Sequence, residues 1–515
     1  MLLVLVLLFF FTLSFAGEKT PLNNGAGYDG AFYYQVAQNF SADFWTSGYD
    51  RFRIFRIFPF FLINLFFSLF NIEPSHANLM HSMYVLHFSN LAIQLFFFFK
   101  LIKLCAWKQT TSALIFGCFF FNHFVLKNCG YEMFQTDAFA NTIFLVSYYY
   151  LLRQKFLQAI AISFSGILTW PTVTYIIWLL YIFKDPFSKN ARYLKFHTGN
   201  ILAIALPLLS IGAVLTLYLL HKQPLLESML FIPSSKPLLF VSAITWSTFL
   251  YIVFRNSDCH IYAPLTYARE FIHQSPWKKM AMILIPFIAI YLYLHAHAND
   301  TFFFSEVAFI LQAFLRPLKY PFITPVAHIC YFGILPLLAI FLFRDFSKNI
   351  FNRSPGYALA FIVFMFFAID SEARHIIPFL PLILVPLGDT IEKANLSAKT
   401  VATLLSLQIV LSHFYIPLNV DGFARSLVIN DYYGISQRYF MNFGPWMSFS
   451  SLAIWTGISI VTGFLVYQIV QKRKFYPFTP HFTPSNVKPP LSSPQNFLFL
   501  RATFNNINSI SGIKI

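Results

Sequence analysis

Long apolar runs separated by short polar stretches dominate this chain. Residues 201–220, 281–298 and 451–470 are three such runs. A helix needs roughly 20 apolar residues to cross a hydrocarbon core about 30 Å thick. The runs are continuous and do not alternate between apolar and polar positions, so they predict helices and not strands. Inside lipid, backbone polar groups must be satisfied within a helix or a closed barrel. The pattern therefore predicts an all-α polytopic membrane protein.

The apolar runs also divide the chain into expected membrane helices. After a first apolar segment at 1–16, the expected helices are 83–104, 109–126, 137–152, 156–169, 171–183, 196–220, 238–254, 280–297, 325–343, 356–370, 376–391, 400–418 and 448–471. Several are short for a full crossing, so we expect about 12–14 spans. The predicted order is a first helix or signal at 1–16, a first outer loop at 17–82, a multi-helix membrane domain at 83–474 and a tail at 475–515.

The two ends of the chain and the first outer loop carry further signals. Ser14-Phe15-Ala16 before Gly17 resembles a signal-peptidase site, but no basic segment precedes the apolar run, which favours a retained helix. Within the outer loop, 55–70 is apolar, and we interpret it as an amphipathic or re-entrant helix at the outer interface. The tail is rich in proline, which predicts a disordered cytoplasmic extension.

Charge changes this picture in one respect. The chain has 36 Lys and Arg against 20 Asp and Glu, a formal charge of +16, while its mean hydropathy is +0.61. Basic residues lie in clusters between apolar runs, which argues for membrane topology and against a nucleic-acid partner. With alternating sides, 21 of the 36 basic residues fall inside and 12 outside. The five cysteines contain no Cys-x-x-Cys pair, so we expect neither a disulfide framework nor a zinc site.

Charged residues at a membrane boundary are costly and are candidates for function. The first outer candidate is Gly27-Tyr28-Asp29-Gly30, followed by an apolar i, i+3, i+4, i+7 pattern from Tyr33 to Phe40 that predicts a short helix. Asp29 is either the N-cap of that helix or a carboxylate held at the membrane surface for chemistry. Flanking glycines would let a substrate approach closely.

Two more outer groups contain acidic or basic residues. Tyr131-Glu132-Met-Phe-Gln-Thr136-Asp137 precedes the expected helix at 137–152, and Thr136 or Asp137 capping that helix is the alternative to a functional role. Asp370-Ser-Glu372-Ala-Arg374-His375 lies between two apolar runs, and here the alternative is a solvated hairpin tip with an internal ion pair. Arg suits a phosphate contact because its planar fork pairs with phosphate oxygens and stays charged.

These motifs together resemble the C-type superfamily of membrane glycosyltransferases. The resemblance rests on Asp29-Gly30 followed by paired aromatics in a long outer loop just after the first helix. It also rests on Arg51-Phe-Arg53-Ile-Phe-Arg56-Ile-Phe-Pro59, and on the Glu372-Ala-Arg374-His375 pattern with prolines beyond it. It covers residues 1–200 in organisation and the remainder in helix count.

The resemblance implies transfer of a sugar from a polyprenyl-phosphate donor to an acceptor glycan, lipid or protein on the outer (periplasmic or luminal) side. Asp29 would be the general base of an inverting reaction. The donor phosphate would be bound by Arg374, His375, Arg51, Arg53 and Arg56, and the substrates by Tyr28, Tyr33, Tyr34, Glu132, Asp137 and Glu372. Asp29, Glu132 and Asp137 are also oxygen ligands suited to a divalent cation. We expect a multi-pass protein of the bacterial inner membrane, with the endoplasmic reticulum membrane as the alternative.

Two other function classes remain open. A secondary transporter or lipid flippase also needs many helices, but it should show ionisable residues at mid-membrane and repeated halves. A non-catalytic membrane component of glycan assembly would keep the helices without needing Asp29.

Overall fold

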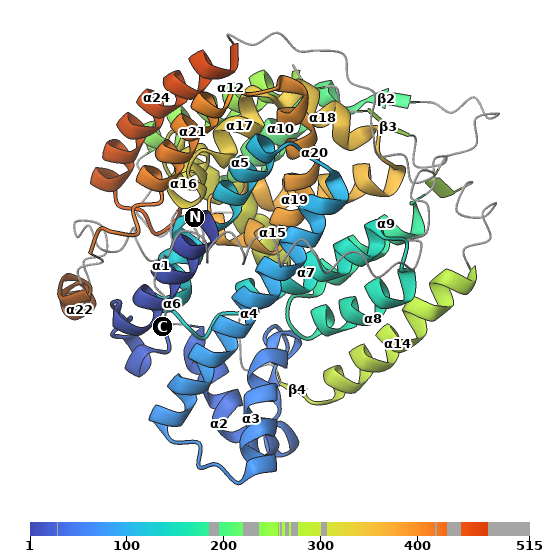
Figure 1. The fold of residues 1–515 in the computed structure, drawn as a ribbon, viewed down its shortest axis with the longest axis vertical. Helices are drawn as coiled ribbons and strands as arrows, with labels where there is room; N and C mark the ends of the chain where they lie inside the picture. The colour runs from blue at the N-terminus through green and yellow to red at the C-terminus, as the bar shows by residue number, and fades with distance from the viewer. Residues whose placement is uncertain are drawn as a thin grey trace, which may run out of the picture. The chain divides into compact units, whose positions relative to one another are not determined.

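The computed structural model describes residues 1–27, 29–184, 195–219, 236–255, 257, 260–262, 267–268, 277–299, 306–417, 420–429 and 444–471. Regular structure in these residues is almost entirely helical (Figure 1). The described strands are short: β1 (Tyr49–Asp50) pairs in parallel with β4 (Ala298–Asn299), and β2 (Lys195–His197) pairs antiparallel with β3 (His260–Tyr262). Contacts divide the chain into Met1–Tyr476 and Pro477–Ile515. The tail predicted at 475–515 lies outside the described residues.

Many helices of the first half begin and end close to the predicted positions, and α7 matches its range of 137–152. The helices are α1 (Leu2–Ala16), η1 (Leu22–Gly25), α2 (Gly30–Thr46), η2 (Ile54–Arg56), α3 (Phe58–Phe70), α4 (His76–Cys105), α5 (Gln109–Phe120), the π-helix η3 (Phe124–Asn128), α6 (Cys129–Tyr131), α7 (Asp137–Leu152), α8 (Phe156–Ile167), α9 (Pro171–Ile182), α10 (Thr198–Leu219), α12 (Lys236–Arg255) and α14 (Trp277–Ala296). α4 begins at His76 and not at the predicted residue 83, because Ser75 accepts a hydrogen bond from the backbone N–H of Asn78 and caps the helix. The boundary of the first outer loop stays a prediction.

The second half departs more from the pattern. Its helices are α15 (Glu306–Leu315), η4 (Arg316–Leu318), α16 (Ile323–Phe332), α17 (Leu335–Phe341), α18 (Phe343–Phe351), α19 (Pro355–Ile369), η5 (Ala373–Phe379), α20 (Leu380–Ala394), α21 (Ala398–Leu411), α22 (Val420–Ile429) and α24 (Phe449–Gln471). The predicted outer loop at 298–324 thus contains α15, and the predicted single helix at 325–343 is broken.

Within the described residues, six helices are long and apolar enough to cross a membrane, or seven if α5 and the bent continuation Phe124–Tyr131 form one span. Eight further apolar helices have 10–17 residues. Apolar side chains remain exposed on the long helices, such as Ile285 on α14 and Phe464 on α24, as lipid-facing surfaces require. The prediction of an all-α polytopic membrane protein is confirmed, whereas the count of 12–14 spans stays a prediction because it depends on the short helices.

One side chain, Gln408, hydrogen-bonds with the free backbone groups at two breaks in the helices. α5 and its continuation bend by 46°, and α16 stops at Gly333, whose φ of +68° favours glycine. Gln408 of α21 donates to the carbonyls of Phe121 (2.6 Å) and Phe332 (3.1 Å), and its side-chain oxygen accepts from the N–H of Ile334 (2.8 Å). Gln408 is fully buried. It therefore supplies the partners that irregular backbone needs inside a bundle.

The segment between α1 and α4 forms a small core of its own. Figure 1 shows α2 and α3 packed together beside the first turns of α4. Phe60, Ile63 and Phe67 of α3 are buried there, while Leu69 and Phe70 are exposed. α3 has 13 residues, which span about 20 Å and fall short of a hydrocarbon core of about 30 Å. This length favours the predicted position at the interface.

Contacts between loops agree with the predicted alternation of sides. Lys19 after α1 donates to the carbonyl of Gly130 at the end of α6 (2.7 Å), and Lys127 donates to the carbonyl of Ile416 after α21 (3.0 Å). Lys19, Lys127 and Gly130 lie in predicted outer segments, and Ile416 lies near the outer end of the predicted helix 400–418. The outer segments of the prediction therefore meet at one end of the helices.

The segments assigned to the inner side meet one another as well. The indole N–H of Trp107 donates to Asp389 (2.7 Å), Asp389 also pairs with Arg353, and the backbone N–H of Lys108 donates to Glu392 (3.0 Å). These contacts join the turn between α4 and α5 to α20 and to the turn before α19. The alternation is internally consistent, and its direction rests on the basic clusters.

Candidate active site

Asp29 stands at the N-cap position of α2, but its side chain makes no capping hydrogen bond. Its carboxylate instead faces two arginines: Oδ2 lies 3.5 Å from Nη2 of Arg374, and Oδ1 lies 3.6 Å from Nη2 of Arg53. The Asp29 side chain is 39% exposed, so solvent still reaches it. The capping alternative is therefore not how this carboxylate is used here.

The two glycines around Asp29 have different structural reasons, a positive φ at Gly27 and close packing at Gly30. Gly27 has a φ of +87°, and a Cβ there would lie 3.6 Å from the side chain of Glu132. A Cβ on Gly30 would lie 3.0 Å from that of Phe134. These glycines bring the Asp29 turn against the segment of Glu132 and Phe134, and the expectation that they also let a substrate approach stays a prediction.

Arg374 connects Asp29 to a buried charge cluster after α19. Arg374 Nε donates to Glu372 Oε1 (2.6 Å) while its Nη2 faces Asp29, from which it is separated by 345 residues in the chain. We expected these two charged groups to approach within about 15 Å, the reach of one phosphosugar between its partners, and this proximity is confirmed. Their catalytic roles stay predictions.

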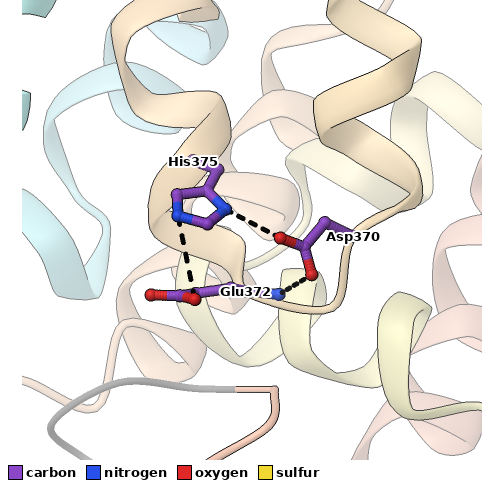
Figure 2. A group of neighbouring side chains, drawn as sticks. All are labelled: Asp370, Glu372 and His375. Atoms are coloured by element: carbon purple, nitrogen blue, oxygen red, sulfur yellow. Dashed lines mark hydrogen bonds and ion pairs between the residues drawn. The ribbon is translucent and has the colours of Figure 1, made fainter. Parts of the chain in front are cut away.

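The cluster itself consists of Asp370, Glu372 and His375, which Figure 2 shows pointing toward one another from the turn between α19 and η5. His375 Nδ1 lies 2.7 Å from Asp370 Oδ2, and the N–H of Glu372 donates to Asp370 Oδ1 (3.1 Å). Arg316 at the start of η4 joins both carboxylates through Nη1, at 3.1 Å from Asp370 and 2.6 Å from Glu372. All four side chains are buried, so the solvated hairpin tip is ruled out.

Sequence reasoning did not single out Arg316. Its only signal is a basic residue in an apolar stretch on the predicted outer side, and its partners lie 54 and 56 residues further along the chain.

The Arg51–Arg56 segment divides into three different environments. Arg53 faces Asp29 and also pairs with Asp50, which is buried and accepts the N–H of Arg53 (2.8 Å). Burial raises the pKa of Asp50, and Arg53 opposes that rise. Arg51 is exposed, and its backbone N–H donates to Asn299 beside the β1–β4 pair.

Arg56 differs from its neighbours in having aromatic partners. Its guanidinium lies 4.1 Å from the ring centre of Trp170 and 4.4 Å from that of Phe52. Among the described residues the Arg56 side chain makes no ion pair or hydrogen bond, while its backbone N–H donates to the carbonyl of Arg53 (2.8 Å). Trp170, buried at the start of α9, also packs toward His375, with the ring centres 6.3 Å apart. Trp170 was missed because it is a single residue between two apolar runs.

The second acidic group lies against the same site. Glu132 is buried and accepts a hydrogen bond from the side chain of Gln135, and burial raises its pKa to about 7, although nearby Arg374 lowers it. Asp137 is the buried first residue of α7, and its Oδ1 has no hydrogen-bond partner among the described residues. Thr136 makes no side-chain cap. An unsatisfied buried carboxylate oxygen calls for a ligand or water, which favours the functional interpretation of this group.

The three tyrosines predicted to bind substrate, Tyr28, Tyr33 and Tyr34, have different environments. Tyr33 is 3% exposed and stacks on Phe60 (ring centres 4.6 Å apart), so it belongs to the α2–α3 core and is corrected as a substrate residue. Its place in the i, i+3, i+4 pattern of α2 explains this. Tyr34 is partly exposed and its hydroxyl lies 3.3 Å from His76 Nδ1. Tyr28 lies outside the described residues.

A cation-binding geometry occurs at a different place from the one expected. Asp370, Glu372 and His375 bring ligand atoms within 4.8 Å of one another. Asp29, Glu132 and Asp137 do not form such a group in the described part of the chain. At the first cluster, however, the guanidinium of Arg316 already contacts both carboxylates.

Comparisons with models of known families, with curated proteins and with solved structures found no match for this chain.

Proposed function

We propose that this protein is a membrane glycosyltransferase that moves a sugar from a polyprenyl-phosphate donor to an acceptor glycan, lipid or protein. The observation that supports it best is the convergence of distant segments on Asp29. Arginines from the first outer loop and from the turn after α19 flank this carboxylate. Paired carboxylates and guanidinium groups at one end of an apolar bundle suit a substrate with a charged head and a hydrocarbon tail.

An apolar cavity beside the charge cluster suits the hydrocarbon tail of such a donor. It has a volume of about 120 Å³ and is lined by residues of α12, α16, α17, α18, α19, η5 and α20. Ile369 and Ile376 line it, and these residues are next in sequence to Asp370 and His375. Phe343 and Phe346 line it too. Both lie in α18, the helix that follows α16 and α17 in the chain. A polyprenyl chain in this cavity would place its phosphate next to Arg374.

In the reaction, Asp29 takes the proton of an acceptor hydroxyl as its oxygen attacks the anomeric carbon. The bond between that carbon and the phosphate oxygen breaks, and the electron pair leaves with the polyprenyl phosphate. One base and direct displacement give inversion. Proton acceptance by a positioned carboxylate contributes about 10²–10⁴-fold to a rate.

Arg56 and Arg374 are the groups best suited to the leaving phosphate. Arg56 has no carboxylate partner among the described residues, and stacking on Trp170 and Phe52 fixes its plane. Arg374 must release Asp29 when a phosphate binds between them, because the two groups are 3.5 Å apart in this structure. Donor binding therefore frees the base at the moment when it is needed. His375 and Arg53 complete the positive side of the site.

The membrane best suited to this activity is the bacterial inner membrane, with the endoplasmic reticulum membrane as the alternative. Both carry polyprenyl-phosphate sugars with their reactions on the periplasmic or luminal face.

A lipid flippase or secondary transporter is the second candidate, because broken helices often form transport sites. The breaks after α5 and α16 favour it. Gln408 ties both breaks together through three buried hydrogen bonds, which favours fixed bends over moving gates. A flippase would move labelled polyprenyl-phosphate sugar between the leaflets of a vesicle without consuming it, whereas the proposed enzyme would consume it.

Mass spectrometry of lipids bound to the purified protein tests the donor class. We expect a polyprenyl-phosphate sugar on the wild type and about tenfold less on Arg56→Gln, since a charged hydrogen bond of about 1.5–3 kcal/mol is lost. Lys155→Gln, an exposed basic residue at the other end of the helices, is the matched control and should keep the lipid. Purified wild type that carries only ordinary phospholipids would contradict the proposal.

A further inference from the structure

Arg316 contacts two of the three potential metal ligands that cluster after α19. Its single Nη1 atom lies 3.1 Å from Asp370 Oδ2 and 2.6 Å from Glu372 Oε2. His375 faces the same two oxygens, with Nδ1 at 2.7 Å from Asp370 and Nε2 at 3.7 Å from Glu372. One cationic nitrogen thus bridges two carboxylates, which is the contact pattern of a point charge and not that of a bidentate fork.

The buried carboxylates of Asp370 and Glu372 require a cation beside them. Asp370 is 1% exposed and Glu372 is 2% exposed, and two adjacent carboxylates at that depth cannot both stay ionised without compensation. Arg316 is itself 6% exposed, and its Nη2 donates to Gln312 Oε1 (2.6 Å), which fixes the guanidinium from the preceding helix, α15. The positive charge is therefore built into the chain at a defined point.

We propose that Arg316 is a built-in substitute for a divalent cation and the positioning residue of the site. By fixing Glu372 it orients Arg374, whose Nε donates to the other oxygen of the same carboxylate (2.6 Å). By fixing Asp370 it orients the ring of His375. Arg374 and His375 are assigned to the donor phosphate, and their orientation then depends on Arg316, which does not itself contact the substrate. This last consequence rests on the proposed function, whereas the replacement of an ion by Arg316 does not.

Removal of the guanidinium should convert the cluster into a real metal site. Arg316→Ala leaves two carboxylates and one imidazole around an unfilled position, a ligand set that suits Zn²⁺. We expect full-length Arg316→Ala in detergent to bind one Zn²⁺ at least about tenfold more tightly than the wild type in a titration calorimeter. Zn²⁺ should also raise its thermal unfolding midpoint, and a chelator should reverse that rise. Adding Asp370→Asn to the variant should remove the gain.

Lys319→Ala is the matched control. Lys319 is a buried cation three residues away that donates to the carbonyl of Pro445, and its loss should create no zinc site. Equal Zn²⁺ affinity in the wild type and Arg316→Ala, or the same gain in Lys319→Ala, would overturn the proposal. If Arg316→Ala does not fold, Arg316→Gln takes its place. Failure of both variants to fold with Zn²⁺ present would also overturn it.

The role in positioning has its own readout. If the wild type transfers sugar, Arg316→Ala should lose transfer and recover part of it with Zn²⁺ or free guanidinium ion. Transfer is measured per folded molecule, because a role in folding alone would let Zn²⁺ raise the folded fraction and leave the transfer rate of each folded molecule unchanged. The two proposals can also fail separately. If the wild type transfers no sugar but Arg316→Ala gains affinity for Zn²⁺, the proposed function is refuted, and the proposal that Arg316 replaces a divalent cation is supported.

Discussion

Substitution of Asp29 separates catalysis from structure because its carboxylate carries little of the fold. It makes no capping hydrogen bond, and its ion pairs with Arg53 and Arg374 are long, at 3.6 and 3.5 Å, and 39% exposed on the Asp29 side. Such pairs contribute about 0–1 kcal/mol each. We therefore expect both Asp29→Asn and Asp29→Ala to change the free energy of unfolding by no more than about 1–2 kcal/mol. A true N-cap would be more sensitive to Ala than to Asn.

The effect on activity should be much larger. Both variants lose proton acceptance, so transfer should fall by about 10²–10⁴-fold, equivalent to about 3–5 kcal/mol of barrier. The assay is transfer of radiolabelled sugar from polyprenyl phosphate in reconstituted vesicles, with thermal unfolding measured on the same samples. Asp43→Asn on the same helix is the control, since Asp43 contacts Gln35 and should leave transfer unchanged. Full transfer by folded Asp29→Asn protein would refute the reasoning.

Three further outcomes test other parts of the structure. Gln408→Leu should lower the free energy of unfolding by about 1–3 kcal/mol or more, measured by denaturant titration, because it leaves buried backbone groups unsatisfied. Glu132 has its pKa raised from 4.5 to about 7 by burial, so the folded state keeps a proton that the unfolded chain releases. The thermal midpoint should therefore fall as pH rises from about 4.5 to about 7, and Glu132→Gln should remove this dependence. In a cysteine-free background, Asn24→Cys should react with an impermeant reagent outside intact cells, whereas labelling of Ser397→Cys there would reverse the assigned sides.

The sequence was sufficient for features that depend on local pattern. The range 137–152 became α7 because its apolar run ends at polar residues on both sides. The proximity of Asp29 and Arg374 was predicted from the reaction that the family resemblance implies, because a donor phosphate must lie beside both groups, and the alternation of sides only placed them on the same side. The local pattern does not show which residues, far apart in the sequence, form hydrogen bonds or ion pairs with each other. The break at Gly333 depends on Gln408, which lies 74 residues from the Ile334 N–H that it accepts. Arg316 likewise acquires its meaning only from the carboxylates after α19.

Buried ion pairs rarely add to stability, because desolvation costs about as much as the attraction returns. Stability alone therefore does not explain where these ion pairs lie. The polar contacts at the two ends of the helices differ, and this difference offers an explanation based on function. At the end assigned to the inner side, Arg353 pairs with Asp389, which also accepts from Trp107. Those contacts tie turns together. At the opposite end, the Arg56 guanidinium packs on aromatic rings and makes no ion pair among the described residues, and Asp137 keeps an unsatisfied buried oxygen. A guanidinium without an ion pair and a buried carboxylate oxygen without a hydrogen-bond partner are groups that the charged head of a substrate would satisfy. Buried Arg353 Nε also lacks a hydrogen-bond partner among the described residues, so such atoms alone do not distinguish the two ends. The electrostatic coupling of Asp137 to Arg374 and Arg56 is what supports the proposed site at the Asp29 end.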